Sequence, residues 1–324
     1  MLKNSRTVKK YRWVRGMSLR HENMRTIAIA NQKGGCGKTT TAINLATAFA
    51  VLGKQVILID LDPQAHTTLG LGCDPGALDK TVYHAITNVQ IPASRKQIPI
   101  SKAVQSTNIK GLDLVPSNIL LSGAEFELAT LYGREYVLSR QLKHMRDNYG
   151  ICLIDCSPSL SLLTLNALVA STDVIVPVQT HYYALEGLKQ LLATVDIVRE
   201  RFNHNLRILG VLLTFVESRT TLSRQVQQQM REFFGALVFD TVIRRNVRLA
   251  EAPSAGQPVL TYAPESKGAA DYKALAREII NHRIWAEQMS NGAVLAERVS
   301  NYRLLVEQIG PDHALTEEVG DGRG

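Results

Sequence analysis

The sequence has few cysteines and no long apolar run, and each of these shortages excludes a class of protein. Its apolar runs, such as 151–154 and 174–178, are far shorter than the roughly 20 residues of a membrane-spanning helix. Four Cys in 324 residues, without paired short spacings, indicate a reducing compartment and not a disulfide scaffold. The basic N-terminus has no apolar segment behind it, so it does not resemble a secretory signal.

The sequence also lacks the low hydrophobicity of a disordered chain, and its charge is unevenly distributed. Hydrophobic residues make up 45% of the chain and charged residues 20%, which is an ordinary globular composition. Of the net charge of +8, residues 1–25 carry +7, residues 26–284 carry +5 and residues 285–324 carry −4. A basic folded region favours an anionic partner, whereas a basic tail says little about a site.

The composition and the local patterns divide the chain into three parts. Residues 1–24 lack apolar periodicity, so we expect a basic, disordered arm there. We expect one folded domain over 25–283 and an acidic, partly helical extension over 284–324. The extension has apolar residues at helical spacing, namely Ile284, Leu295, Val299, Tyr302, Val306 and Ile309.

Short apolar runs alternate with helical patterns between residues 25 and 234. This alternation predicts an α/β fold, a doubly wound and mainly parallel sheet with helices on both faces. The expected strands are 25–31, 55–60, 112–116, 150–156, 172–178 and 206–215. The expected helices are about 38–52, 121–131, 134–147, 160–170, 183–202 and 220–234. We expect residues 72–111 to form an irregular insertion.

A glycine-rich segment, NQKGGCGKTTT, joins the first strand to the first helix. In this position, glycines let successive backbone N–H groups face phosphate oxygens at a helix N-terminus, which is typical of a P-loop. Lys38 is then expected to reach the β- and γ-phosphates and Thr39 to bind Mg²⁺. The predicted ATP-binding residues are Lys33, Gly34, Gly35, Cys36, Gly37, Lys38, Thr39 and Thr40.

Acidic residues follow two of the other predicted strands. Asp60 and Asp62 end one strand in the segment DLDPQ, and Asp155 ends another in ICLIDCS. The carboxyl ends of parallel strands meet at one edge of a sheet, where the phosphate loop also lies. Asp155 fits a Walker B pattern, and we expect it to hold Mg²⁺, through water.

Besides Lys38, the loop contains an additional lysine, Lys33. With it, the segment resembles the deviant Walker A motif KGG-x-GK-[ST] of the ParA/MinD group of P-loop ATPases. PVQTHYYALEGL, GVLLTFVESRTTLSRQVQQQMREFF and FDTVIRRNVRLAEAPSAGQPVLTY also resemble the ParA/Soj subfamily, and the likeness covers about 25–282. The resemblance implies that Lys33 crosses a dimer interface to the partner's phosphates. It also implies that Asp62 positions the attacking water and that Asp60 supports the Mg²⁺ shell. Lys33, Lys38 and Asp62 are thus the predicted catalytic residues.

The resemblance further implies a function in DNA partition. Members of this family hydrolyse ATP slowly, and their ATP-bound homodimers bind double-stranded DNA without sequence preference. A ParB-type partner stimulates hydrolysis, and the cycle moves chromosome or plasmid DNA. The implied location is the cytoplasm, at the nucleoid of a bacterial cell. A ParA-like positioner of protein cargo would share this chemistry and remains an alternative.

Arginines supply the charge that DNA binding requires. Residues 199–248 contain nine Arg and four acidic residues, a net charge of +5. The guanidinium group suits phosphate contacts because of its fork of donors. Arg219 and Arg248 match family positions implicated in DNA binding, and we add Arg224 and Arg245 from the same region.

Several positions depart from the family pattern. Ser157 replaces a Pro and Ser161 a Gly after the Walker B strand, His181 replaces a Glu, and Arg244 replaces the Pro of IPRN. MinD-like relatives end in a basic amphipathic helix that binds membranes. The C-terminal extension of this chain is acidic, so we expect no membrane partner and give a MinD-like role less weight.

Overall fold

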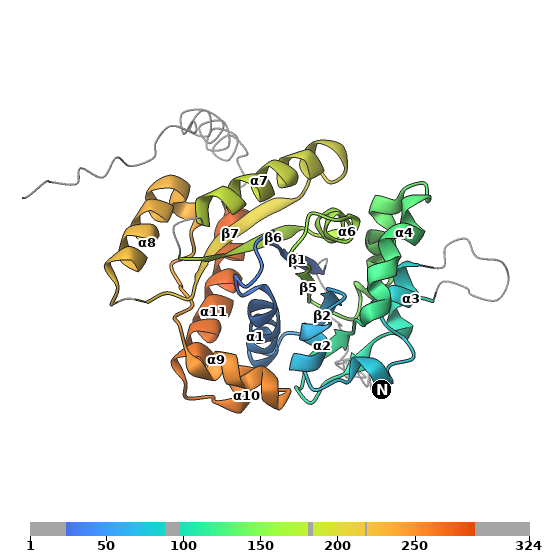
Figure 1. Cartoon of the computed structure of the whole chain (residues 1–324), viewed down its shortest axis with the longest axis horizontal. Helices are drawn as coiled ribbons and strands as arrows, with labels where there is room; N and C mark the ends of the chain where they lie inside the picture. The colour runs from blue at the N-terminus through green and yellow to red at the C-terminus, as the bar shows by residue number, and fades with distance from the viewer. Residues whose placement is uncertain (1–23, 88–97, 181–183, 218, 289–324) are drawn as a thin grey trace, which may run out of the picture.

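A seven-stranded sheet forms the centre of the molecule (Figure 1). The computed structural model of the chain describes residues 24–87, 98–180, 184–217 and 219–288. The strand order is β3-β4-β2-β5-β1-β6-β7, and every pair is parallel except β3 with β4. The strands are β1 (Arg25–Ile29), β2 (Val56–Leu61), β3 (Gln105–Ser106), β4 (Leu112–Val115), β5 (Ile151–Cys156), β6 (Asp173–Gln179) and β7 (Arg207–Thr214).

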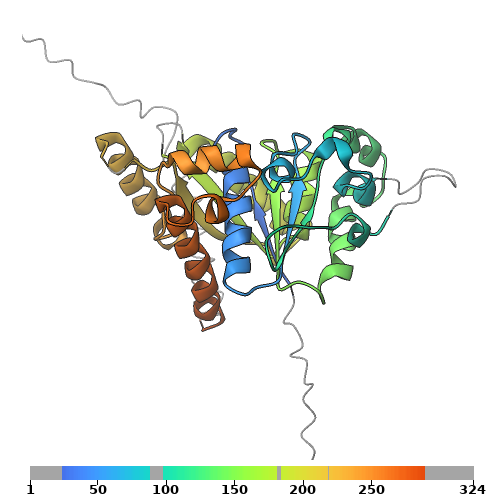
Figure 2. The ribbon, with the colours of Figure 1, turned by 90° about the horizontal axis from the view of Figure 1, so that it is seen from below.

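Helices cover both faces of this sheet. One face packs against the helices α3 (Val82–Ile86), α4 (Ala124–Ala129), α5 (Val137–Leu142), α6 (Leu162–Ala170), α7 (Ala184–Arg201) and α8 (Thr221–Phe234). The other face packs against α1 (Lys38–Val51), α9 (Val247–Glu251), α10 (Val259–Tyr262) and α11 (Lys267–Gln288). Figure 2 shows α1 and α11 side by side on this face. The predicted doubly wound α/β fold is confirmed.

The continuous apolar runs of the sequence become strands because the sheet is covered on both sides. Every residue of β2 and of β5 is buried, so there is no solvent-facing side that would need polar residues. The short helix α2 (His66–Gly70) follows β2 at the carboxyl edge of the sheet. Among the described residues, no helix is both long enough and apolar enough to cross a membrane.

The structure differs from the predictions in three places. The segment 72–111 is not wholly irregular, because it contains α3 and β3, whose two residues pair antiparallel with β4. The expected helices 121–131 and 134–147 are each shorter and are flanked by 3₁₀ turns. The helix α11 continues to Gln288, so the boundary expected at residue 284 lies inside a helix. Except for Met24, which is buried, the N-terminal arm lies outside the described residues.

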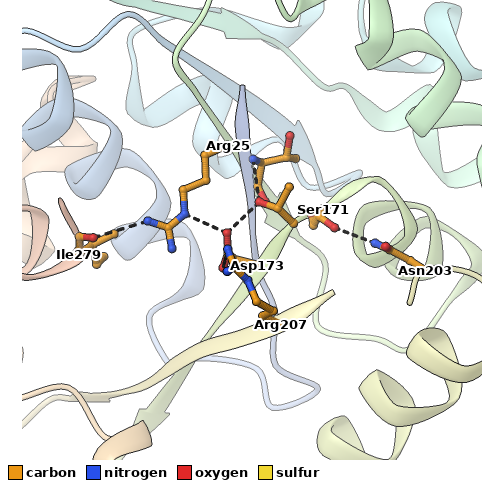
Figure 3. Close-up of polar contacts among 8 residues, drawn as sticks. Arg25, Ser171, Asp173, Asn203, Arg207 and Ile279 are labelled. Carbon is orange, nitrogen blue, oxygen red and sulfur yellow. Dashed lines mark hydrogen bonds and ion pairs between the residues drawn. The ribbon is translucent and has the colours of Figure 1, made fainter. Parts of the chain in front are cut away.

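A buried ion pair joins elements at the amino edge of the sheet (Figure 3). Asp173, the first residue of β6, accepts a hydrogen bond from Arg25 Nε at 2.8 Å and one from the Thr172 hydroxyl at 2.7 Å. Arg207 Nη2 lies 3.2 Å from the other carboxylate oxygen. Arg25 also donates to the carbonyl of Ile279 at 3.5 Å, which ties α11 to β1. Arg25 is therefore a structural residue, although it was counted with the basic arm.

Candidate functional site

The loop between β1 and α1 has the backbone geometry of an anion-binding turn. Gly35 and Gly37 have φ angles of 71° and 88°. Such left-handed conformations are costly for residues with a Cβ atom, which explains glycine at both positions. Gly37 directly precedes α1, where free N–H groups and the helix dipole attract negative charge. The loop can therefore hold a phosphate group.

Hydrogen bonds fix this loop to the strands beside it. The Asn31 side chain donates to the carbonyl of Pro177 in β6 at 2.7 Å and accepts from the backbone N–H of Lys33 at 3.1 Å. The Thr214 hydroxyl, at the end of β7, donates to the Cys36 carbonyl at 2.9 Å. The loop is thus preorganised by the sheet, which lowers the entropic cost of binding a ligand.

The two lysines of the loop occupy different environments. Lys38 is buried, and its ammonium group donates to the carbonyl of Lys33 at 3.0 Å, which bends the side chain back over the loop. Lys33 is only partly buried and forms no ion pair with any described residue. Gly34 and Gly35 are exposed, and Thr39 and Thr40 are partly exposed in the first turn of α1. Lys33 is therefore available to a group outside this chain.

Two buried carboxylates lie side by side at the carboxyl ends of neighbouring strands. Asp60 of β2 and Asp155 of β5 are register partners, and they are 0% and 1% exposed. Burial, followed by the negative charge of Asp155, raises the pKa of Asp60 to about 8. Asp60 accepts hydrogen bonds from both the N–H and the hydroxyl of Thr68, at 2.8 and 2.7 Å, and from the N–H of Asp62 at 3.2 Å. Both of its oxygens are therefore in use within the chain.

The two oxygens of Asp155 differ in their partners. Oδ2 accepts a hydrogen bond of 2.7 Å from the Thr67 hydroxyl, while the buried Oδ1 has no hydrogen-bond partner among the described residues. Burial raises the pKa of Asp155 to about 6, and the hydroxyls of Thr67 and Thr39 and the charge of Lys38 moderate that rise. A buried acceptor without a donor is costly, and a cation at this oxygen would remove that cost.

These residues fit a magnesium ion. Thr39 and Asp155 offer the oxygen donors that Mg²⁺ prefers, and Oδ1 of Asp155 has no hydrogen-bond partner among the described residues. The described residues contain no cluster of three or more His, Cys, Asp or Glu side chains that could enclose a metal ion. That agrees with Mg²⁺, which is usually held by one or two side chains together with water and substrate phosphates.

The third carboxylate, Asp62, lies in a turn just beyond β2. It is 8% exposed, and its Oδ1 accepts a hydrogen bond from the N–H of Gln64 at 2.9 Å. Ala65 N–H donates to the Asp62 carbonyl at 3.0 Å and closes the turn. The structure thus brings Asp62 to the same edge as the loop and Asp155, as the sequence predicts.

The four arginines proposed for DNA contact are all exposed and lie on adjacent segments. The segments that contain Arg219 and Arg245 run side by side, since Val216 and Arg244 form a parallel bridge. Arg245 pairs with Glu217 at 2.5 Å, and Arg248 pairs with Glu251 at 2.7 Å. Among the described residues, Arg219 forms no ion pair, whereas the Arg224 guanidinium bonds only the Thr221 hydroxyl, at 3.5 Å.

The nine arginines counted over 199–248 do not form one surface, which corrects the charge argument from the sequence. Arg199, Arg207, Arg231 and Arg244 pair with Asp196, Asp173, Asp240 and Asp271. Arg207 is the first residue of β7 and lies beside Asp173 (Figure 3), whereas the loop follows the other end of the parallel strand β1. Sequence proximity is a poor guide here because α7 and β7 each cross the full height of the sheet.

The replacement of a family proline by Arg244 has a structural explanation. The buried carboxylate of Asp271, at the start of α11, accepts hydrogen bonds from both the backbone N–H and the guanidinium group of Arg244. Proline could supply neither donor. His181, the other departure, lies outside the described residues.

Sequence reasoning missed three residues at this edge. Ala65 and Phe215 are the described non-glycine residues with positive φ, both at 53°, and each lies beside the loop or the carboxylates. Such strain is typical of functional sites and has no signal in a single sequence. Thr67 was also missed, because its contact with Asp155 joins residues 88 positions apart.

Comparison with known proteins gives consistent matches. A family model described as an AAA domain matches residues 24–208. The chain is 46% identical to the sporulation initiation inhibitor protein Soj of Bacillus subtilis over 253 residues, 78% of this chain and 97% of that protein. It is also 46% identical to the chromosome partitioning protein ParA of Caulobacter vibrioides over 260 residues, 80% of this chain and 94% of that protein.

A solved structure shares the same fold. The cobyrinic acid a,c-diamide synthase from Mycobacterium smegmatis, with bound ADP and magnesium, superposes with a TM-score of 0.69 and 37% sequence identity. The match covers 80% of this chain and 95% of that one.

Proposed function

This chain belongs to the ParA/Soj family of P-loop ATPases, and from that premise we propose that it partitions chromosome or plasmid DNA. In this proposal it dimerises with ATP, binds double-stranded DNA without sequence preference in that state, and is released when a ParB-type partner stimulates slow hydrolysis. It acts on the nucleoid, in the cytoplasm of a bacterial cell. The solved structure is named a diamide synthase, but the chain is less identical to it than to the relatives named Soj and ParA. We therefore prefer DNA partition to an amide-forming activity.

One observation carries the proposal: an anion-binding loop and a buried carboxylate with an unpartnered oxygen lie where the parallel strands end, and exposed arginines lie on the segment that follows β7 and on the segment bridged to it. The loop binds the phosphates through its N–H groups, and Lys38 exchanges its bond to the Lys33 carbonyl for a phosphate oxygen. Lys33 reaches the nucleotide of a second subunit. Gly34, Gly35, Cys36, Gly37 and Thr40 complete the nucleotide contacts.

The carboxylates divide the remaining chemistry. Thr39 and Asp155 would hold Mg²⁺, Asp155 through water, and the ion would neutralise negative charge on the phosphates. Asp62 orients the attacking water from its turn beside the carboxylate pair. Asp60 supports this shell from behind, through the N–H of Asp62 that it holds.

DNA binding follows from the position of the arginines. Arg219 and Arg248, with Arg224 and Arg245 beside them, face solvent and can form bidentate contacts with phosphates. A dimer presents two such sets, so affinity rises steeply when ATP joins the subunits. Each phosphate contact releases counterions, so binding weakens as salt is added.

A gel-shift experiment with a random DNA duplex tests this proposal. We expect binding with ATPγS and Mg²⁺ but not with ADP, and we expect Arg219→Glu with Arg248→Glu to abolish it. Arg201→Glu, an exposed arginine at the end of α7, is the matched control and should bind normally. Unchanged DNA binding by the double variant would refute the assignment of these arginines.

A second measurement tests dimerisation separately from DNA binding. Light scattering should show an ATPγS-dependent dimer of the wild-type chain and only monomers of Lys33→Ala. The Lys33→Ala chain should still bind nucleotide, because Lys38 and the loop N–H groups remain. A normal dimer of this variant would remove the cross-subunit role of Lys33.

A further inference from the structure

Two consecutive threonines at the start of α2 contact different carboxylates of the site. The Thr67 hydroxyl donates to Asp155 Oδ2 at 2.7 Å, and the Thr68 hydroxyl donates to Asp60 Oδ2 at 2.7 Å. Both threonines are 0% exposed. The short helix α2 is therefore fastened to the ends of both β2 and β5, which lie side by side in the sheet.

The bond to Asp60 belongs to a closed structural network. The Thr68 hydroxyl also accepts a hydrogen bond from the N–H of Ser117 at 2.9 Å. Asp60 accepts three hydrogen bonds in total, and these engage both of its oxygens. Asp60 therefore keeps no oxygen without a partner, and these bonds tie β2, α2 and the segment after β4 together.

The bond to Asp155 is different because it engages one oxygen and leaves the other open. With Oδ2 held by Thr67, rotation of the carboxylate is restricted, and within the described part of the chain the buried Oδ1 has no hydrogen-bond partner. A single well-placed hydrogen bond of this kind fixes the direction in which a carboxylate presents its remaining oxygen.

The backbone holds α2 where Thr67 can make this contact. Ala65, which precedes the helix, has a φ angle of 53°, a strained conformation that turns the chain back towards the sheet. Gly70 lies against Ile43 of α1 so closely that a Cβ atom there would be 2.5 Å from the Ile43 side chain. The left-handed turn at Ala65 and the packing of Gly70 on Ile43 thus set where α2 lies against the sheet and α1.

We propose that Thr67 is a positioning residue that orients Asp155 towards the Mg²⁺ of the bound nucleotide. This inference rests on the proposed function, because it concerns the same ATP site. It assigns the two threonines separate roles: Thr67 acts on metal binding, and Thr68 acts on the stability of the fold.

The test compares ADP affinity in Mg²⁺ with ADP affinity in EDTA, by titration of fluorescent mant-ADP into the full chain. Thr67→Val keeps the shape of the side chain but removes the donor. We expect it to reduce the gain in affinity from Mg²⁺ by about tenfold to a hundredfold, as is usual when a residue that orients a metal ligand is lost. Its affinity in EDTA should match the wild type, and Thr67→Ser should restore the gain.

The matched control is Thr68→Val. We expect it to lower the melting temperature and to leave the ratio of the two affinities unchanged. A double-mutant cycle adds a second readout: Thr67→Val should have no further effect on metal dependence in an Asp155→Asn background, because the two residues act as one unit.

An unchanged Mg²⁺ gain in Thr67→Val would overturn the inference, as would an equal loss of affinity in Mg²⁺ and in EDTA, or a failure of Thr67→Ser to restore the gain. In each of these cases the wild-type chain still binds nucleotide with Mg²⁺, so the proposed function survives. A wild-type chain that binds no ADP in either condition would instead refute the proposed function, and the inference with it.

Discussion

Asp173 at the amino edge of the central sheet and Asp155 at its carboxyl edge are both buried near a strand end, but their surroundings differ. At the amino edge, Asp173 has two arginines and a threonine hydroxyl as partners (Figure 3). Burial alone would raise its pKa, but the hydrogen bond and charge of Arg25 and the charge of Arg207 hold the pKa below its usual range. At the carboxyl edge, Asp155 keeps one oxygen open, and burial raises its pKa to about 6.

The difference shows how one sheet separates stability from function. The amino edge is complete, so its charges contribute to folding without any ligand. The carboxyl edge is incomplete, and the described non-glycine residues with strained φ angles, Ala65 and Phe215, are both found there. We expect the binding of a cation and phosphates to stabilise this edge most, because they supply the partners that its carboxylate and loop N–H groups lack within the chain.

The largest expected effect comes from removing the open carboxylate. Asp155→Asn should reduce Mg²⁺-dependent ATP hydrolysis about a thousandfold, which corresponds to about 4 kcal/mol of transition-state stabilisation. Its free energy of unfolding without ligand should not fall, because the variant removes a buried charge. Phosphate-release assays and urea unfolding measure the two quantities. A clear loss of stability would show that Asp155 has a structural role.

The reciprocal change at the amino edge should affect folding alone. Asp173→Asn leaves Arg25, whose side chain is only 12% exposed, without its counter-charge. We expect the free energy of unfolding to fall by about 3 kcal/mol, as for other broken buried pairs. Hydrolysis per folded molecule should remain normal. A loss of activity without a loss of stability would contradict the separation of the two edges.

The pH dependence of stability should also have opposite signs at the two edges. The folded chain binds protons at Asp60 and Asp155, whose pKa values are raised to about 8 and about 6, so this stability is lost as pH rises through those values. We expect the ligand-free chain to lose about 2 kcal/mol between pH 6 and pH 8. Asp173 has a lowered pKa, so its contribution is lost only below about pH 4.

Urea unfolding at a series of pH values measures this difference. In Asp155→Asn, the loss of stability between pH 6 and pH 8 should become smaller, because Asp60 no longer has a charged neighbour. In Asp173→Asn, the free energy of unfolding should be lower at every pH, but it should fall by the same amount between pH 6 and pH 8. An identical slope in the wild type and Asp155→Asn would argue against coupling between the two carboxylates.

The smallest expected effect on stability comes from replacing Arg207, the exposed arginine beside Asp173. The Arg207 side chain is 55% exposed, and water screens its charge. Arg207→Gln should therefore lower the free energy of unfolding by about 0.5 to 1 kcal/mol. Arg25→Gln should cost more, because that arginine is buried and also bonds the Ile279 carbonyl. Equal losses of stability in the two variants would show that the burial of each arginine does not determine how much its ion pair with Asp173 contributes.

The parts of the site that are close in sequence were predictable. The loop from Asn31 to Thr41 was recognised because its glycines, lysines and flanking elements are contiguous. The position of Asp62 and Asp155 at this edge was predictable because each lies at or just beyond the end of a strand, and parallel strands end at one edge. Arg207 was misplaced because its position in the sequence, close to Arg219, gave no sign that β7 separates them.

By itself, the sequence determined the alternation of strands and helices, the glycine conformations of the loop and the identity of the chemical groups. These depend on local geometry and on apolar patterns that one segment contains. Only the tertiary structure decided which aspartate would be neutralised by arginine and which would keep an open oxygen. That choice depends on the register of neighbouring strands and on a helix, α2, that brings Thr67 to a residue 88 positions away.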